Sequence, residues 1–219
     1  MQDLSQLLII LPVLLFSLTI HEMAHAVTAD WYGDPTARRL GRISLNPLVH
    51  LDPVGSVLLP LMAFYLGGFI FGWAKPVPVN TANLQNHRRD FLVIAAAGPA
   101  SNIVMAIGAS ALLGLVPGGL GAAEGTPAVL ATLLLFMVQL NLILAVFNML
   151  PIPPLDGGNV LAGLLPETLA ASYDRLIRPF GFLILIVLMA TGPSGLYGTS
   201  WLSRIIGPPY SMLMRWLQP

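Results

Sequence analysis

Long runs of apolar residues, separated by short polar stretches, are the main pattern along this chain. Five apolar segments stand out, at residues 4–29, 54–73, 91–116, 127–150 and 179–197. Because about 20 apolar residues span the core of a bilayer, the first, third and fourth segments are predicted to be membrane helices. The fifth has a shorter apolar core. The tail from Trp201 to Trp216, broken by Pro208 and Pro209, is predicted to lie at the membrane interface.

Basic residues between the segments predict how the chain is oriented. No Lys or Arg precedes the first segment or falls in residues 117–126. Three other connecting stretches all carry basic residues, namely 30–50, 74–90 and 151–178. The positive-inside rule therefore predicts that these three stretches face the cytoplasm and that the N-terminus lies outside.

The segment at 54–73 conflicts with this pattern, because both of its flanks are basic and a single crossing would separate them. A simple kinked span is one interpretation, since the length of the segment allows it. The interior Pro60 and the Gly67–Gly68 pair favour the other, a re-entrant hairpin that enters and leaves on the cytoplasmic side.

Composition narrows the class of protein. Of the 219 residues, 56% are hydrophobic and 9% charged, whereas a soluble domain has about 25% charged residues. The net charge of +0 gives no electrostatic footprint for nucleic acid, and the absence of cysteine excludes a disulfide scaffold, a thiol nucleophile and a Cys-ligated metal. We predict one all-α polytopic membrane domain over residues 1–219, with about four to six membrane helices. Short β-strands are expected near 36–50 and 75–80.

Three polar residues at the end of the first segment suit a metal site. His21, Glu22 and His25 form the pattern H-E-x-x-H, and positions i and i+4 of a helix share a face. Both imidazoles can therefore bind one metal ion, for which zinc is suited, and Glu22 can take a proton from a water that the metal activates. A buried His pair bonded to backbone carbonyls is the structural alternative, and the intervening Glu argues against it.

A third ligand is expected at Asp156, which follows the segment at 127–150. The residues around it stop a helix and permit close backbone approach: Pro151, Pro153, Pro154, Gly157 and Gly158. This local unwinding can aim the carboxylate at a metal. A solvated Asp in a helix-ending turn is the alternative.

These motifs together resemble those of a known family. His21-Glu22-x-x-His25 and Asn148-x-x-Pro-x-Pro-x-x-Asp156-Gly resemble the site-2 protease family of intramembrane zinc metalloproteases. The run from Gly98 to Asn102 resembles the G-P-x-x-N element of that family. The resemblance covers about residues 5–165 and is greatest to the short prokaryotic members without a PDZ or CBS domain.

The resemblance implies roles for individual residues. It implies that His21, His25 and Asp156 bind one Zn²⁺ and that Glu22 is the catalytic acid/base. It also suggests that Asn148 and Asn102 hydrogen-bond the substrate or the developing oxyanion. For each Asn, an interhelical hydrogen bond is the alternative.

The resemblance also implies an architecture. It divides the domain into a catalytic core at about 5–165 and a C-terminal helix with an interfacial tail at 170–219. Independently of the resemblance, alternation makes residues 40–46 a candidate edge strand for the substrate, and proline placement makes the loops at 75–79 and 151–154 candidate clamps. We interpret His50 as a surface-loop residue; a second polar cluster with Asp52, or a further metal contact, is the alternative.

The expected function is hydrolysis of peptide bonds in transmembrane segments, of membrane-anchored regulators or remnant signal peptides. The expected location is the prokaryotic plasma membrane, with the active site toward the cytoplasm and the oligomeric state open. Two alternatives stay open. One is another membrane zinc protease with a Glu ligand, although Glu124 and Glu167 stand in no matching motif. The other is a non-proteolytic transporter or channel that uses buried His and Asp.

Overall fold

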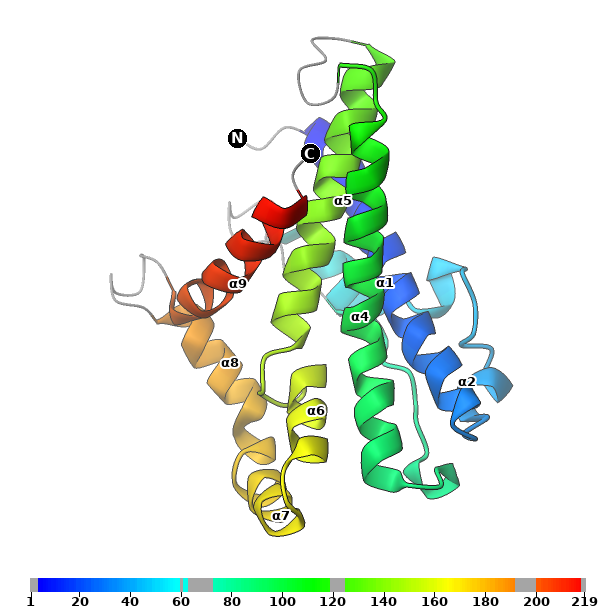
Figure 1. Cartoon of the computed structure of the whole chain (residues 1–219), viewed down its shortest axis with the longest axis vertical. Coiled ribbons are helices and arrows are strands. Elements are labelled where there is room, and N and C mark those ends of the chain that lie inside the picture. The colour runs from blue at the N-terminus through cyan, green and yellow to red at the C-terminus, as the bar shows by residue number, and fades with distance from the viewer. Residues whose placement is uncertain (1–3, 60, 63–72, 119–124, 192–199, 218–219) are drawn as a thin grey trace.

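The computed structural model describes residues 4–59, 61–62, 73–118, 125–191 and 200–217, and within these the chain forms helices and turns. Three long helices dominate the molecule, α1 (Leu4–Trp31), α4 (His87–Gly114) and α5 (Thr126–Asn148) (Figure 1). Each is long and apolar enough to cross a membrane. This confirms an all-α polytopic fold, with candidate spans where the sequence predicts them, at 4–29, 91–116 and 127–150.

Helix α4 is the centre of the bundle, since it packs along both α1 and α5. Its contact with α5 is built from small residues, among them Ala106 and Ala109 of α4 and Ala131 of α5, all of which are buried. Small side chains let membrane helices approach closely. On the outer face of α4, Val104 and Leu112 are exposed, as lipid-facing residues are.

Two short helices follow α5 and bring the chain back against α4. They are α6 (Asp156–Leu164) and α7 (Glu167–Leu176). A Cβ atom on Gly163 would lie 2.7 Å from the Cβ of Leu92, so glycine permits the close approach of α6 to α4. The Arg88 guanidinium donates to the carbonyl of Ala162, 2.9 Å away, and to that of Leu165. Arg88 therefore satisfies carbonyls at the end of α6.

The C-terminal part forms α8 (Gly181–Ala190) and α9 (Trp201–Leu217). Helix α9 continues through Pro208 and Pro209, so the break predicted at these residues is wrong. Its inner face packs on the α4–α5 core, where Met214 is buried and Tyr210 and Leu213 are partly buried. This packing holds the helix together where the two prolines cannot donate hydrogen bonds.

The strands predicted near 36–50 and 75–80 are absent among the described residues. Residues Thr36–Arg39 form α2, and Pro47–Val49 form a 3₁₀ turn. Residues 75–80 lie outside any helix but have no partner strand, because side chains bind their backbone groups instead. The Arg42 guanidinium donates to the carbonyls of Lys75 and Pro76, at 2.6 and 2.8 Å.

A buried carboxylate holds the other end of this extended segment. The Asp34 carboxylate accepts hydrogen bonds from the backbone N–H of Asn80 and the side chain of Asn83, each at 2.7 Å. Burial raises the pKa of Asp34, but these bonds and those from Thr36 outweigh it, so the pKa lies below its usual value. Asp34 is thus an ionised anchor for this loop.

The segment at 54–73 begins and ends at the same place. The N–H of Trp73 donates to the carbonyl of Gly55 at 3.1 Å, and the Ser56 hydroxyl donates to the carbonyl of Trp73 at 2.8 Å. One crossing of a bilayer would separate such ends by about 30 Å. The re-entrant hairpin predicted for 54–73 itself lies largely outside the described residues.

The basic connecting stretches share one end of the molecule. Helix α2, the start of α4 and helix α7 all lie in the lower half of Figure 1, whereas α4 ends and α5 begins at the top. The α4–α5 connection at 117–126 carries no Lys or Arg. The charge asymmetry in the sequence thus corresponds to two ends of the helix bundle.

Candidate metal centre

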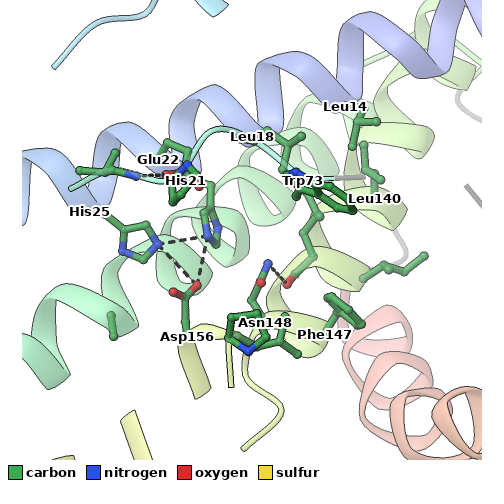
Figure 2. Close-up of a pocket in the computed structure, with 18 of the residues that line it drawn as sticks. Leu14, Leu18, His21, Glu22, His25, Trp73, Leu140, Phe147, Asn148 and Asp156 are labelled. Atoms are coloured by element: carbon green, nitrogen blue, oxygen red, sulfur yellow. Dashed lines mark hydrogen bonds and ion pairs between the residues drawn. The ribbon is translucent and has the colours of Figure 1, made fainter. Parts of the chain in front are cut away.

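Two imidazoles on one face of α1 meet a carboxylate from the start of α6 (Figure 2). His21 Nε2 and His25 Nε2 lie 3.1 Å apart. The Asp156 Oδ2 atom lies 3.1 Å from the first and 3.4 Å from the second. Both His side chains are buried. The structure therefore brings together the three residues that the sequence suggested as metal ligands.

The hydrogen bonds of the two Nδ1 atoms indicate whether the Nε2 atoms, which face the cluster, have a hydrogen or a lone pair. His25 Nδ1 lies 2.7 Å from the carbonyl oxygen of Ile94, which can only accept, so this nitrogen donates. In a neutral ring, His25 Nε2 then has a lone pair and no hydrogen. His21 Nδ1 similarly lies 2.6 Å from Asn102 Oδ1.

The inner atoms of this cluster are all electron-pair donors. Asp156 Oδ2 is buried and makes no conventional hydrogen bond. The ligand atoms of the three residues lie within 4.8 Å of one another, and no other such group occurs among the described residues. Two imidazole nitrogens and a carboxylate oxygen are the donor set of a zinc site. The residues therefore fit a bound zinc ion.

Gly98 allows α4 to cover this cluster. A Cβ atom at this position would lie 2.3 Å from His25 Nε2 and 2.6 Å from His21 Nε2. Any larger residue would displace the imidazoles. The sequence marked Gly98 only through a family resemblance. The physical signal was a glycine in the interior of a predicted membrane helix, where glycine usually has a packing reason.

The proline-rich loop after α5 delivers Asp156. A Cβ atom on Gly157 would lie 2.3 Å from the carbonyl oxygen of Met149, and one on Gly158 would lie 2.8 Å from the nitrogen of Pro153. The Tyr173 hydroxyl donates to a carbonyl of the same loop at 3.0 Å. The loop therefore folds tightly over the end of α5, and α6 begins with its first carboxylate facing α1.

Glu22 is held beside the cluster by the extended segment. Its carboxylate accepts a hydrogen bond from the N–H of Val77 at 3.0 Å. Val77 stands between Pro76 and Pro78, which have no N–H, so it provides the one donor of this trio. This hydrogen bond thereby fixes the carboxylate of Glu22, which directly follows His21 in the sequence.

A cavity of about 850 Å³ opens beside these residues. It extends along α1 from His25 to Ile10 and is bordered by α5, α8 and the segment at 73–79. Its walls are mainly apolar, and Figure 2 shows Leu14, Leu18 and Leu140 on the side away from the metal ligands. The polar groups of the site thus lie at one end of an apolar cavity between membrane helices.

The two candidate asparagines have different places. Asn148 lines the cavity and donates one hydrogen bond to the carbonyl of Leu144, at 3.0 Å. Asn102 is fully buried and contacts His21 and Asn141, and it does not line the cavity. Its bond to Asn141 joins α4 to α5, as in the interhelical alternative. Asn141 was not recognised in the sequence, because it stands in no motif and its role depends on helix packing.

His50 differs from its interpretation as a surface-loop residue. It is buried, its Nε2 lies 2.9 Å from the carbonyl oxygen of Ser44, and its own carbonyl accepts the N–H of Lys75 at 2.8 Å. The residue joins two loops beside the extended segment, and its Nδ1 is buried without a hydrogen-bond partner.

The chain is similar to a known protein family and to curated proteins of bacteria. The model of peptidase family M50 matches residues 9–189. The chain is 37% identical over 185 residues to the protein named "Putative zinc metalloprotease YwhC" of Bacillus subtilis, covering 84% of this chain and 80% of that protein. It is 37% identical over 184 residues to "Putative zinc metalloprotease Rip2" of Mycolicibacterium smegmatis, covering 81% of this chain and 64% of that protein.

The comparison with solved structures gave no match. The family match nevertheless extends over most of the chain and includes the three candidate ligands, His21, His25 and Asp156, and the helix α4 that covers them. This chain therefore belongs to peptidase family M50, the site-2 protease family of zinc metalloproteases.

Proposed function

We propose that this protein is an intramembrane protease that hydrolyses peptide bonds in transmembrane segments of other proteins. One observation carries the proposal. The cluster of His21, His25 and Asp156, with Glu22 beside it, lines the same cavity as a long apolar wall between membrane helices. Such a cavity suits the apolar side chains of a membrane-embedded substrate.

In this proposal His21, His25 and Asp156 hold one zinc ion. A zinc ion bound there supplies Lewis acidity and lowers the pKa of a coordinated water to about 7. Glu22 takes the proton of the attacking water and gives it to the leaving amine. The N–H of Val77 keeps the Glu22 carboxylate in position for both transfers.

Asn148 is the candidate donor to the substrate. It lines the cavity together with Asp156, and one hydrogen of its amide is engaged by the carbonyl of Leu144. The second hydrogen can bind a substrate carbonyl or the charge that develops on it. Because helical carbonyls are already hydrogen-bonded, the substrate must unwind locally to reach this site. The proposed substrates are membrane-anchored regulators or remnant signal peptides.

The proposed location is the prokaryotic plasma membrane, with the active site toward the cytoplasm and the N-terminus outside. His21 stands 17 residues after Leu4, which is about 26 Å along a helix. The basic stretches lie at the end of the bundle toward which α1 runs. Both observations support a site below the cytoplasmic surface.

Glu22→Gln tests the proposal. The amide oxygen can still accept from Val77, so the variant is expected to keep zinc while cleavage falls by about 10²- to 10⁴-fold. Glu167→Gln, which changes an exposed Glu on α7, is the matched control and should cleave normally. Cleavage of a model transmembrane substrate and zinc content by mass spectrometry are the measurements.

Membrane proteomics extends the test to the cell. Fragments that accumulate with Glu22→Gln and not with Glu167→Gln would identify the substrates. Full cleavage by Glu22→Gln would overturn the role of Glu22. A wild-type protein that holds zinc but cleaves no transmembrane substrate in the purified assay would favour the transporter or channel alternative.

A further inference from the structure

We propose that Asn141 is a positioning residue for the metal centre: acting through Asn102, it fixes the His21 ring with hydrogen on Nδ1 and a lone pair on Nε2. The inference rests on the proposed ligand set. It concerns a residue that touches neither the metal ligands' donor atoms nor the cavity.

A continuous line of hydrogen bonds joins α5 to His21. Asn141 Nδ2 donates to the carbonyl of Met137 at 2.8 Å and to the hydroxyl of Ser17 at 3.0 Å. Asn102 Nδ2 donates to Asn141 Oδ1 at 2.7 Å, and Asn102 Oδ1 lies 2.6 Å from His21 Nδ1. The side chains of Asn141, Asn102 and Ser17 all have 0% exposure, so bulk water cannot exchange with these bonds.

The carbonyl of Met137 determines the direction in which each hydrogen bond of this line is donated. A peptide carbonyl only accepts, so the Asn141 atom facing Met137 must be the amide nitrogen. Asn141 then presents its oxygen to Asn102, which must answer with its own nitrogen. Asn102 consequently presents oxygen to His21, whose Nδ1 must donate. Reversing either amide would place two acceptors or two donors face to face in a buried site.

The direction of these hydrogen bonds matters because the second nitrogen of the His21 ring, Nε2, faces the other two candidate ligands. With hydrogen on Nδ1, His21 Nε2 offers its lone pair toward His25 Nε2 and Asp156 Oδ2, as a metal ligand requires. The other tautomer would place a hydrogen in the middle of the donor cluster. A partner that fixes the ligating tautomer in this way raises metal affinity.

The two imidazoles differ in how they are fixed. His25 Nδ1 donates to the backbone carbonyl of Ile94, which cannot turn over. His21 depends on a side-chain amide, which can rotate by half a turn unless a second group prevents it. Asn141 is that second group, and it also joins α1, α4 and α5 through Ser17 and Asn102.

Zinc affinity of the purified chain, measured by chelator competition, tests this inference. Asn141→Leu releases the Asn102 amide and is expected to weaken zinc binding by about 10- to 100-fold. In Asn141→Asp, a protonated buried carboxyl can donate to the carbonyl of Met137 and keeps an oxygen that accepts from Asn102, so this variant should bind zinc more tightly than Asn141→Leu. Leu142→Ala is the packing control, because Leu142 is fully buried beside Asn141 but apolar. It should lower the melting temperature and leave zinc affinity unchanged.

A double-mutant cycle shows whether the effect passes through Asn102. In the Asn102→Leu background, adding Asn141→Leu should cause no further loss of zinc affinity. Unchanged affinity in Asn141→Leu, equal losses in Asn141→Leu and Asn141→Asp, or additive losses in the cycle would each overturn the inference. Asp156→Ala is measured in parallel: if it binds zinc normally, the ligand set itself is wrong, independently of Asn141.

Discussion

Gly98 shows how one residue can determine whether a metal centre forms. The missing side chain leaves room for two imidazoles under the surface of α4. One turn further along α4, Asn102 binds the outer nitrogen of His21. The same turn of helix therefore covers the ligands and orients one of them, which gives a physical reason for the order of residues in Gly98-Pro99-Ala100-Ser101-Asn102.

Gly98→Ala is expected to impair zinc binding. The added Cβ would lie 2.3 Å from His25 Nε2, so the helix or the imidazole must move. Overpacking of this kind costs about 1–3 kcal/mol, which is about a 5- to 150-fold loss of zinc affinity. Gly108→Ala is the control on the same helix, since nothing lies within 4 Å of its added Cβ. Equal zinc affinity in the two variants would refute this account of Gly98.

At the residue scale, the sequence predicts charged ligands better than neutral partners. His21, Glu22, His25 and Asp156 stand out because ionisable groups are rare and costly in apolar segments. Asn102 and Asn141 differ in visibility: the first stands in a recognisable motif, the second does not. The hydrogen-bond partner of each Asn depends on which helix packs against it, and this packing cannot be predicted from the position of the residue in the sequence.

At the scale of elements, the extended segment at 75–80 connects a loop to the proposed catalytic base. Buried Arg42 donates to the carbonyls of Val49, Lys75 and Pro76, and the next residue, Val77, donates to Glu22. One cation thus fixes the backbone that positions the carboxylate. Each buried carbonyl left without a donor costs about 1–3 kcal/mol.

Arg42→Met is expected to reduce cleavage while zinc stays bound. The variant removes the donors to three carbonyls but none of the contacts of His21, His25 or Asp156. A displaced catalytic group lowers the rate by up to about 100-fold, and zinc content separates this effect from loss of the metal. Arg39→Met, at an exposed position of α2, is the matched control. If Arg42→Met cleaves as fast as Arg39→Met, the extended segment does not position Glu22.

Elements were predicted well where periodicity and length suffice. The three spans depend only on long apolar runs, and their ends fall close to those of α1, α4 and α5. The strands at 36–50 and 75–80 were wrong because alternation and prolines indicate extended backbone without indicating a partner. Here Arg42, Glu22 and Asp34 bind the backbone groups that a partner strand would have bound.

At the scale of the whole molecule, the metal centre depends on elements far apart in the chain. Helix α1 supplies two ligands and the base, α4 covers them, and the loop after α5 delivers Asp156 more than a hundred residues later. The centre therefore forms only when these helices are packed, and bound zinc should in turn stabilise their packing. Composition could predict the membrane class, but not the cavity along α1.

X-ray absorption at the zinc edge of the Asp156→Cys variant tests the central claim most directly. The natural chain has no cysteine, so the variant contains a single thiolate. If Asp156 is the third ligand beside His21 and His25, the spectrum should show one sulfur at about 2.3 Å and two imidazole nitrogens at about 2.0 Å from zinc. Bound zinc with two imidazoles and no sulfur would show that position 156 does not reach the metal, and would contradict the account.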